Sequence, residues 1–417
     1  MAEPLDLAGV ANVVIVGGGI AGASLACALA SAGVGVTVLE SSTVFRDRVR
    51  GESMAPWGVR EARALGVEKV LLDAGAHVAG IWKQYSEDEA EPFDIPMSSM
   101  VPGVSGSLNL AHPVACQALV DAAAAEGARI VRGVRDVKMS AGATIEVSYA
   151  TDSSDRVVSG LVVGADLVVG ADGRNSVVRR QCGVTLERQE PVNHIAGLLV
   201  EGLEQVPFDH DVWAREGEVS LLVFHQGSCR ARAYLVVGNS GQRRFSGPEG
   251  PTRFLSACVL SCVPWSVELA HGVPAGPCAT YPGDDTWTPT PYADGVVLIG
   301  DAAGYNDPII GQGLSIALRD ARLVRDLILE GGRAASDFAP YGQERSGRME
   351  RLRLIADIFS AQSEDVANRS ARRAFVRDKL SSLDPEFFTL LVGAFSGPET
   401  IPDELVRSDL LDQVRSA

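Results

Sequence analysis

Short apolar runs that end at a glycine or an acidic residue set the pattern of the first part of the chain. Val13–Val16 has the length and β-branched composition of a strand, small residues continue through Ala32, and a second apolar run ends at Glu40. β-Branched residues favour strands, whereas a run of small residues at helical length favours a closely packed helix. The pattern predicts a strand–helix–strand unit whose second strand ends at Glu40.

Two later apolar runs also end beside a glycine and an aspartate. The stretch "ADLVVGADGRNSVVRR" reaches Asp172, and the stretch "VVLIGDAAGYNDPIIGQGLSIALRDA" passes Gly300 and Asp301 before a helix that starts near Gly313. Glycine lets bare backbone approach a ligand, and the free amides at a helix start favour negative charge. We therefore expect the second stretch to form half of a binding site.

The pattern changes between residues 190 and 290. "HIAGLLVEGL", "EVSLLVFHQ" and "CRARAYLVVG" are rich in β-branched and aromatic residues and are separated by polar turns. They predict an antiparallel sheet inserted between the two stretches that end at Asp172 and Asp301. The tail, residues 338–417, contains "RSGRMERLRLIADIFS" with apolar residues at helical spacing, which predicts helices packed on the first domain. Contact with a second copy in a homodimer is the alternative for this tail.

Composition narrows the class of protein. With 417 residues and 46% apolar content, the chain can build one large or two medium domains, and its net charge of −16 argues against nucleic-acid binding. Its seven cysteines are odd in number and scattered, which favours reduced thiols in a cytoplasmic protein and no metal site. We see neither a signal peptide nor an apolar stretch long enough to span a membrane.

The first glycines form a dinucleotide-binding fingerprint. In Gly17-x-Gly19-x-x-Gly22 the first glycine makes the turn, the second lets a pyrophosphate approach the backbone, and the third permits close helix–strand packing. Glu40, 18 residues after Gly22, is placed to accept hydrogen bonds from an adenosine ribose. This unit alone does not distinguish a flavin from a nicotinamide.

The fingerprint, the Asp-Gly motif at Asp172 and the Gly-Asp motif at Gly300 and Asp301 occur in an order that resembles the class A FAD-dependent monooxygenases, the flavoprotein aromatic hydroxylases. The resemblance covers about residues 11–330. It implies an α/β fold with a Rossmann-like FAD-binding domain, an inserted β-rich substrate domain and C-terminal helices.

The resemblance also implies roles for individual residues. Asp301 would contact the flavin ribityl chain, and Asp172 would serve both FAD and NADPH binding. The residues implied against the isoalloxazine ring are Pro308, Gly311, Gln312 and Gly313, and those implied near the flavin are Arg50, His112 and Gln117. The family's helix start commonly carries an arginine or a glutamine, whereas this chain has histidine at 112 and glutamine only at 117.

The inserted sheet supplies the substrate-pocket candidates. Alternation along the strands would direct part of one set into the cavity, and the sequence does not say which face points inward. This set is Leu221, Val223, His225, Arg232 and Tyr234. His225 and Tyr234 are the candidate polar contacts to substrate.

The implied reaction is hydroxylation or epoxidation of a mid-sized organic molecule, possibly aromatic or polyketide-like. NAD(P)H would reduce FAD, and O2 would add to form a flavin C4a-hydroperoxide. The sequence identifies no substrate-activating base. A separate flavin reductase stays an alternative source of electrons.

Two further flavoenzyme classes and one non-enzyme class stay open. Geranylgeranyl-reductase-like proteins share the "GDAAGxxDPxxGxG" pattern of residues 300–313. Flavin-dependent halogenases share a "GES" stretch, here Gly51-Glu52-Ser53, and need a lysine, for which Lys83 is the candidate. Their paired-tryptophan signature is missing, because "DDTWTPTPY" does not match it. The non-enzyme class is a non-catalytic flavin-binding scaffold.

The expected division of the chain follows these signals. It comprises a first FAD-binding segment (1–82), a substrate-domain segment (83–108), a second FAD-binding segment (109–185), the β-rich substrate domain (186–290), a third FAD-binding segment (291–335) and the C-terminal helical region (336–417).

Overall fold

A mainly parallel sheet forms the centre of the first domain in the computed structural model, which describes residues 12–49, 51–140, 145–153, 156–238, 244–364, 367–407 and 409–417. Its order is β21-β22-β12-β1-β2-β8, and β21 alone runs antiparallel to its neighbour within these described ranges. The strands are β1 (Val13–Val16), β2 (Val36–Glu40), β8 (Arg129–Arg132), β12 (Leu167–Gly170), β21 (Tyr292–Ala293) and β22 (Val296–Leu298). The predicted strand–helix–strand unit is confirmed.

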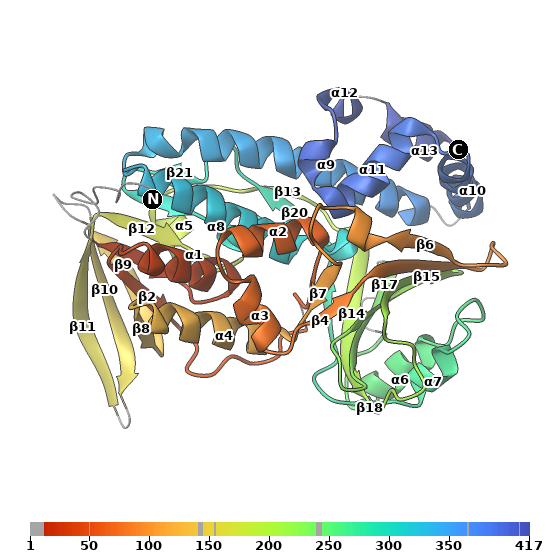
Figure 1. Cartoon of the computed structure of the whole chain (residues 1–417), viewed down its shortest axis with the longest axis horizontal. Coiled ribbons are helices and arrows are strands. Elements are labelled where there is room, and N and C mark those ends of the chain that lie inside the picture. Colours follow the sequence, from red (N-terminus) through yellow and green to blue (C-terminus); the bar gives the residue numbers. More distant parts are fainter. Residues whose placement is uncertain are drawn as a thin grey trace.

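Alternate residues of this sheet face different layers. Val13 and Ile15 pack against helices, whereas Val14 and Val16 pack against a second, antiparallel sheet. The helical layer comprises α1 (Ile20–Ser31), α2 (Pro56–Ala64), α3 (Glu68–Asp73), α4 (His112–Ala125) and α8 (Gly313–Leu329). The antiparallel layer comprises β9 (Val134–Ser140), β10 (Ile145–Ser153) and β11 (Arg156–Ala165), with α5 (Val177–Gln181) beside it. Figure 1 shows these strands extending from the lower left of the first domain.

The second domain is built on a larger sheet. Its order is β18-β14-β17-β16-β15-β5-β6, with β19 also paired to β14. The strands are β5 (Ile81–Ser86), β6 (Phe93–Pro96), β14 (Asn193–Glu201), β15 (His210–Glu216), β16 (Val219–His225), β17 (Ala231–Gly238), β18 (Val273–Pro274) and β19 (Ala279–Pro282). The sheet was expected to be antiparallel, but β15 and β5 run parallel because β5 arrives from an earlier stretch of the chain. β5 also crosses the expected boundary between residues 82 and 83.

The two faces of this sheet have different partners. Residues such as Leu221, Val223 and Leu235 pack under α6 (Gly250–Ala257) and α7 (Ser266–Ala270). Leu222, Phe224 and Tyr234 form the opposite, inner face. Figure 1 shows α6 and α7 below the sheet and the tail helices above it.

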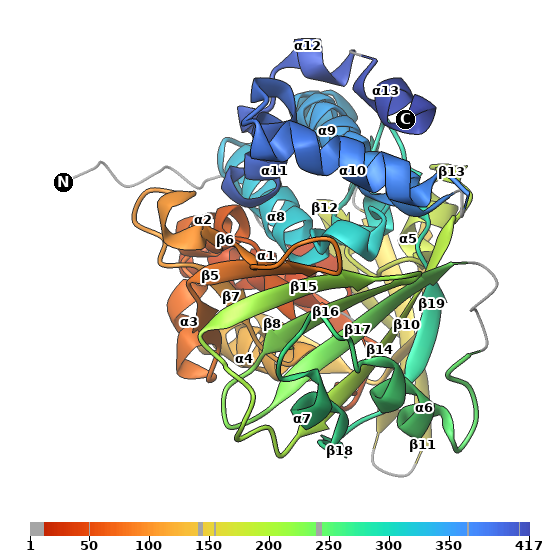
Figure 2. The same ribbon diagram turned by 90° about the vertical axis from the view of Figure 1, so that its right-hand side faces the viewer.

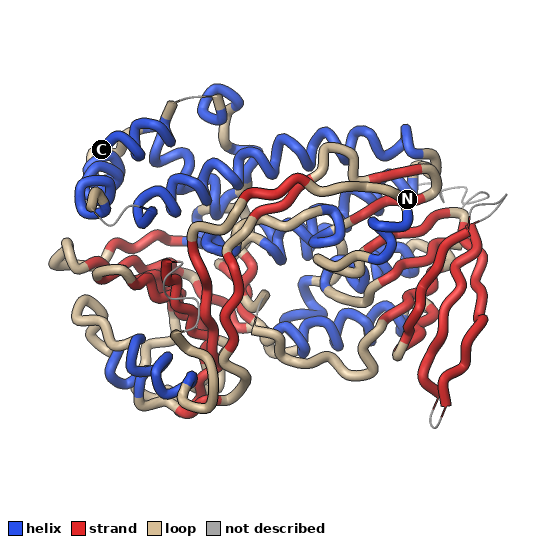
Figure 3. Tube along the Cα trace, turned by 180° about the vertical axis from the view of Figure 1, so that it is seen from behind, coloured by secondary structure: helices blue, strands red, loops and turns tan. Residues whose placement is uncertain are grey.

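Short elements join the longer helices and strands. They are β3 (Ser53–Met54), β4 (His77–Ala79), β7 (Ser107–Asn109), β13 (Glu187–Gln189) and β20 (Asp285–Trp287), and the 3-10 helices η1 (Met97–Ser99), η3 (Gly300–Ala303), η4 (Pro308–Ile310), η5 (Ala335–Phe338) and η6 (Pro398–Thr400). β7 pairs with β3 and β4, and β13 pairs with β20. Viewed from behind in Figure 3, the second domain lies at the left and the long antiparallel strands β9, β10 and β11 lie at the right.

The tail is helical, as expected, and belongs to the core of the first domain. Its helices are α9 (Ala339–Glu364), α10 (Arg369–Ser381), α11 (Pro385–Ser396), α12 (Asp403–Val406) and α13 (Leu410–Ser416). Phe387, Leu390 and Leu410 are buried in the same apolar cluster as Val13. Figure 2 shows the tail helices above the second sheet. Among the described residues, no helix has both the length and the apolarity to cross a membrane.

Candidate functional site

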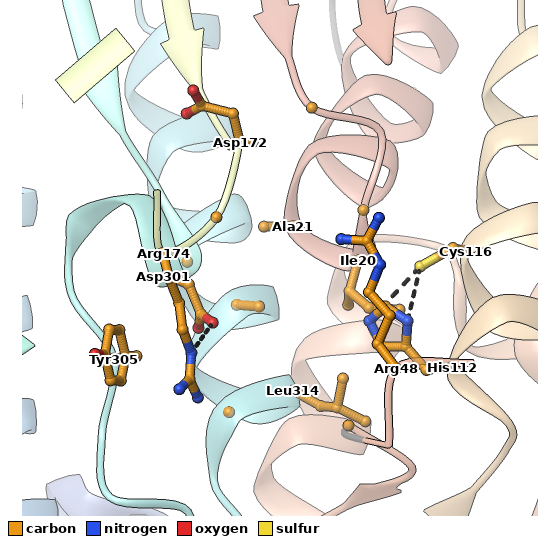
Figure 4. A pocket seen from close by; sticks show the side chains of 18 of the residues that line it. Ile20, Ala21, Arg48, His112, Cys116, Asp172, Arg174, Asp301, Tyr305 and Leu314 are labelled. Carbon is orange, nitrogen blue, oxygen red and sulfur yellow. Dashed lines mark hydrogen bonds and ion pairs between the residues drawn. The ribbon is translucent and has the colours of Figure 1, made fainter. Parts of the chain in front are cut away.

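A cavity of about 660 Å³ lies where the parallel strands of the first domain end (Figure 4). Parallel strands present their carboxyl ends at one edge, so the turns after β1, β2, β12 and β22 meet there. The predicted site residues that line this cavity are Gly17, Gly19, Glu40, His112, Asp172, Gly300, Asp301, Pro308, Gly311 and Gly313, together with Tyr234. We call this space the flavin cavity.

Each of the three fingerprint glycines is required for a different structural reason. A Cβ on Gly17 would lie 2.3 Å from the Ala171 carbonyl oxygen, and its φ of +106° favours glycine. A Cβ on Gly22 would lie 2.0 Å from the Gly17 oxygen, so this glycine permits close packing and does not line the flavin cavity. Gly19 has open space around it at the start of α1. That open cradle beside free helix amides fits a pyrophosphate.

Glu40 and Asp172 organise the backbone around the flavin cavity. The buried Glu40 carboxylate accepts hydrogen bonds from the amides of Gly18 and Ser42, each at 2.6 Å. Asp172 accepts from the Ser176 hydroxyl and the Val177 amide, each at 2.5 Å. Both acids therefore fix local turns as well as lining the cavity.

Asp301 carries an ion pair that the sequence did not indicate. Arg174 Nε lies 3.2 Å from Asp301 Oδ2, and the guanidinium sits 3.9 Å from the centroid of the Tyr305 ring. The Tyr305 hydroxyl donates to Asp284 at 2.8 Å, and burial raises its pKa to about 12. Figure 4 shows Arg174, Asp301 and Tyr305 grouped on one side of the cavity.

The loop before α8 delivers Pro308, Gly311 and Gly313 to the cavity, but Gln312 turns away. The Gln312 side chain accepts from Trp57 Nε1 at 2.8 Å and donates to the Ala394 carbonyl at 3.1 Å. The Gln312 side chain thus ties the loop to α2 and α11 and does not line the flavin cavity.

The three residues implied near the flavin, Arg50, His112 and Gln117, do not all lie at the flavin cavity. His112 lines the cavity at the start of α4, with its Nδ1 atom 3.6 Å from Cys116 Sγ. Gln117 lies outside it, because it donates to Asp121 at 2.7 Å and accepts from Arg132 at 2.9 Å. Arg50 lies outside the described residues.

Strand register decides which inner-sheet residues reach the flavin cavity. Leu222 pairs with Tyr234 and Phe224 pairs with Arg232, so these four share the inner face. His225, like Leu221 and Val223, points to the opposite face, because side chains alternate along a strand. His225 is buried near His210, and burial lowers its pKa to about 3. Of the two substrate-pocket candidates, only Tyr234 lines the cavity.

Tyr234 belongs to a buried polar cluster that sequence reasoning missed. Its hydroxyl donates to Glu52, whose carboxylate lies 3.1 Å from Arg232, and Arg232 lies 2.6 Å from Asp47. Burial raises the pKa of Glu52 against the opposing charge of Arg232, and burial also raises the pKa of Tyr234. Glu52 was noticed only as a member of "GES", because no local pattern marks a carboxyl that becomes buried through a distant strand.

Lys83 does not line the flavin cavity. Its Nζ lies 2.6 Å from Asp94 across the β5–β6 pair. In the stretches of chain that the structure describes, no cluster of histidine, cysteine or acidic residues has the arrangement of a metal site.

Known proteins show the same architecture. A family model described as "FAD binding domain" matches residues 10–353. Kynurenine 3-monooxygenase from Salinispora tropica is 27% identical over 449 aligned positions, which cover 97% of this chain and 92% of that protein. Squalene monooxygenase SE1 from Panax ginseng is 25% identical over 328 residues, 78% of this chain and 60% of that protein.

The chain spans about three fifths of the length of the plant squalene monooxygenases that it matches. The crystal structure of CmlS, a flavin-dependent halogenase, is similar with a TM-score of 0.74 at 20% identity, covering 97% of this chain and 76% of that one. At that identity the likeness concerns the fold alone.

Proposed function

Because the chain belongs to the class A flavoprotein monooxygenase family, whose FAD-binding domain it carries, we propose that it uses NAD(P)H and O2 to hydroxylate or epoxidise a mid-sized organic molecule. Oxygen activation at flavin C4a, implied by the resemblance, belongs to this proposal, as does a possibly aromatic or polyketide-like substrate. Bound FAD would supply the electron transfer and the activation of oxygen.

One observation carries the proposal. The flavin cavity joins a dinucleotide cradle at Gly19 to an apolar wall formed by Ile195, Leu222 and Phe224 of the second domain. An apolar wall excludes water, which oxygen transfer to an organic substrate requires. A cofactor extended along the cradle would therefore place its reactive end against a dry surface.

We propose that the cradle residues hold FAD as the resemblance implies. Gly17 and Gly19 would admit the pyrophosphate, Glu40 would face the ribose, and Asp301 would face the ribityl chain. The amino end of α8 at Gly313 would stabilise negative charge on the reduced flavin ring. Arg174 would hold Asp301 in place through their 3.2 Å ion pair.

We further propose that Glu52 and Tyr234 move a proton at the apolar end of the flavin cavity. The Tyr234 hydroxyl already donates to the Glu52 carboxylate, and both residues line the cavity. A hydroxyl whose proton can pass to a neighbouring carboxyl is suited to general acid–base work on a substrate hydroxyl.

Anaerobic stopped-flow reduction tests the proposal. The FAD-loaded protein would be mixed with NADPH or NADH and then with O2, with and without candidate phenolic and polyene substrates. We expect reduction by at least one nicotinamide, followed by oxygen uptake that yields an oxygenated product. Reduction without any oxygen-dependent product, together with saturation of an alkene under anaerobic conditions, would instead support the geranylgeranyl-reductase-like activity.

Halogenation and a non-catalytic role have weaker support. Halogenation needs a lysine near the substrate, but Lys83 is paired with Asp94 outside the flavin cavity. A colourless protein that does not take up FAD would favour the non-catalytic scaffold. A homodimer and a cytoplasmic location stay predictions, and a separate reductase stays the alternative source of electrons.

A further inference from the structure

A second cavity, of about 300 Å³, lies between the second sheet and the tail helices. Its floor comes from β5 and β15, and its opposite wall comes from α9, α10 and α11. Much of the lining is apolar, including Trp213, Phe359, Phe387 and Leu390. None of the described residues that line this space also lines the flavin cavity. We call it the tail cavity.

A buried cation lies on the floor of the tail cavity. Arg215 is 8% exposed, its guanidinium carbon sits 4.4 Å from the centroid of the Trp213 ring, and one Nη donates to the Gln362 side-chain oxygen at 2.8 Å. Neither of these partners carries a negative charge. The buried Nε of Arg215 has no hydrogen-bond partner among the described residues.

A second arginine strengthens this positive region. Arg373 is 7% exposed and lines the same cavity, and its buried Nε also lacks a partner within the described ranges. It lies 3.4 Å from the carboxylate of Glu87, whose side chain is 38% exposed. Burial and the charge of Arg373 together lower the pKa of Arg215 to about 9, so Arg215 stays charged at neutral pH.

Among the described residues, no carboxylate is hydrogen-bonded to Arg215, and the charge of Asp88 offsets its burial only in part. A buried guanidinium without a bonded anion is costly, and a carboxylate is a ligand that its donors fit well. The cavity around it offers flat aromatic and aliphatic walls, which favour an aromatic ring. At the mouth, Asp88, Glu89 and Glu91 are exposed, and their charges disfavour ligands with several negative charges. The chemistry that fits is one carboxylate attached to an aromatic body.

We propose that the tail cavity binds a small aromatic carboxylic acid, with its carboxylate on Arg215 and its ring against Trp213 and Phe359. Trp213 pairs across the strands with Leu222, which lines the flavin cavity, so the occupant lies one strand away from the site of chemistry. The proposal goes beyond the oxygenation reaction. Binding is measured without turnover, so failure of one proposal leaves the other intact.

Titration calorimetry with two matched probes tests this site in the FAD-loaded protein. We expect 2-naphthoate to bind at one site per chain and its uncharged analogue 2-naphthamide to bind at least about tenfold more weakly, because only the carboxylate can pair with Arg215. Arg215→Met should abolish that preference by weakening naphthoate binding at least about tenfold while leaving naphthamide binding unchanged.

Two further variants keep the result interpretable. Arg373→Met removes the second charge near the mouth and should weaken naphthoate binding by a smaller factor, even if Arg215→Met fails to fold. Arg129→Met, at an exposed position on β8, is the matched control and should change nothing. The proposal would be overturned if the two probes bound equally well, or if naphthoate binding survived both arginine substitutions. It would also be overturned if naphthoate shifted the visible flavin spectrum, because that shift would show that naphthoate occupies the flavin cavity.

Discussion

At the scale of single residues, the fingerprint glycines contribute to two separable properties. Gly22 is needed for helix–strand packing, since an added Cβ would lie 2.0 Å from a backbone oxygen. Gly19 is not needed for packing, since nothing lies within 4 Å of its added Cβ, but it lines the flavin cavity. Stability and cofactor affinity should therefore respond to different substitutions.

We expect Gly22→Ala to lower the free energy of unfolding by about 1–3 kcal/mol, because rigid backbone must shift to admit the methyl group. Gly19→Ala should cost the apoprotein only about 1 kcal/mol, the effect of alanine at the N-cap of α1, but should weaken FAD binding about tenfold. Urea denaturation and FAD fluorescence quenching measure the two effects. Gly164→Ala, at an exposed strand position with no atom within 4 Å, is the control and should change neither.

Tyr234→Phe tests the proposed proton transfer. Removal of the hydroxyl should lower kcat by about 10²-fold, the lower end of general acid–base contributions, while FAD binding is retained. The hydrogen bond from Tyr234 lowers the pKa of Glu52 against the larger effect of burial. Without it Glu52 keeps its proton to higher pH, so the acid limb of the kcat profile should move to higher pH.

The control is Tyr149→Phe, because Tyr149 is buried on β10 away from the flavin cavity. An unchanged kcat and pH profile in Tyr234→Phe would reduce the Glu52–Tyr234 pair to a structural hydrogen bond.

At the scale of elements, α9 does more than cover the first domain. Arg345 and Arg348 of α9 lie 3.0 and 2.7 Å from the carboxylate of Asp320 on α8. Asp320 also accepts from the Gly300 amide at 2.8 Å, and Arg345 donates to the Gly304 carbonyl at 2.7 Å. The Gly-Asp turn is therefore held from behind by two helices.

Arg345→Met should destabilise the protein by about 3–5 kcal/mol, because it leaves a buried carboxylate charge only partly compensated. The arginines hold the pKa of Asp320 below its usual value despite burial. The stabilisation from this pair is present above the unfolded-state pKa and is lost as the pH falls through the folded-state pKa. Guanidinium unfolding at pH 7 and at about pH 3, below the unfolded-state pKa, should therefore show a smaller loss at the lower pH, and the exposed Arg180→Met should show none.

The link between β7 and β15 predicts the opposite pH trend. The fully buried Asp211 carboxyl accepts from the Ser107 hydroxyl and from Asn109 Nδ2, each at 2.6 Å, and burial raises its pKa to about 7. A raised folded-state pKa gives stability that is present at low pH and lost as the pH rises toward 7.

Asp211→Asn should remove this loss, because an amide can accept from Asn109 and donate to the Ser107 oxygen without becoming charged. The stability of the variant relative to the native protein should rise between pH 5 and pH 7 by about 2 kcal/mol. Thermal unfolding of both proteins across this range measures the difference. A difference that does not change with pH would show that Asp211 titrates normally in the folded protein.

Strands and helices were more predictable than the faces they present. The runs at Val13–Val16 and Val36–Glu40 and the helix at Gly313 could be read from periodicity and glycine positions. Gln117 and His225 were harder, because a shift of one position reverses the direction of a side chain on a strand and rotates it by about 100° on a helix. The pairing register between neighbouring strands places Tyr234 in the cavity and His225 outside it, and this register cannot be read from the sequence.

At the scale of the whole molecule, predictability followed sheet topology and not distance along the chain. Strand ends of a parallel sheet meet at one edge, so the grouping of Glu40, Asp172 and Asp301 could be expected. The pairing of Glu52 with Tyr234 spans 182 residues and depends on how the second sheet docks. The support of Gly300 by Arg345 depends on helix packing. Neither leaves a local sequence signal.

The flavin cavity is lined by both domains, and this predicts that FAD stabilises the molecule as a unit. Gly19 and Asp301 come from the first domain, whereas Leu222 and Tyr234 come from the second. A ligand that binds only the folded state adds about 2.7 kcal/mol when its free concentration is about a hundred times its Kd. Removal of FAD should therefore lower the Tm, and proteolysis should become faster at the connections between the domains.

Because Gly19→Ala weakens FAD binding, the FAD-dependent gain in Tm of this variant, at the same FAD concentration, should be smaller than that of the native protein. Equal Tm values with and without FAD would show that the cofactor does not bind in the cavity that joins the domains.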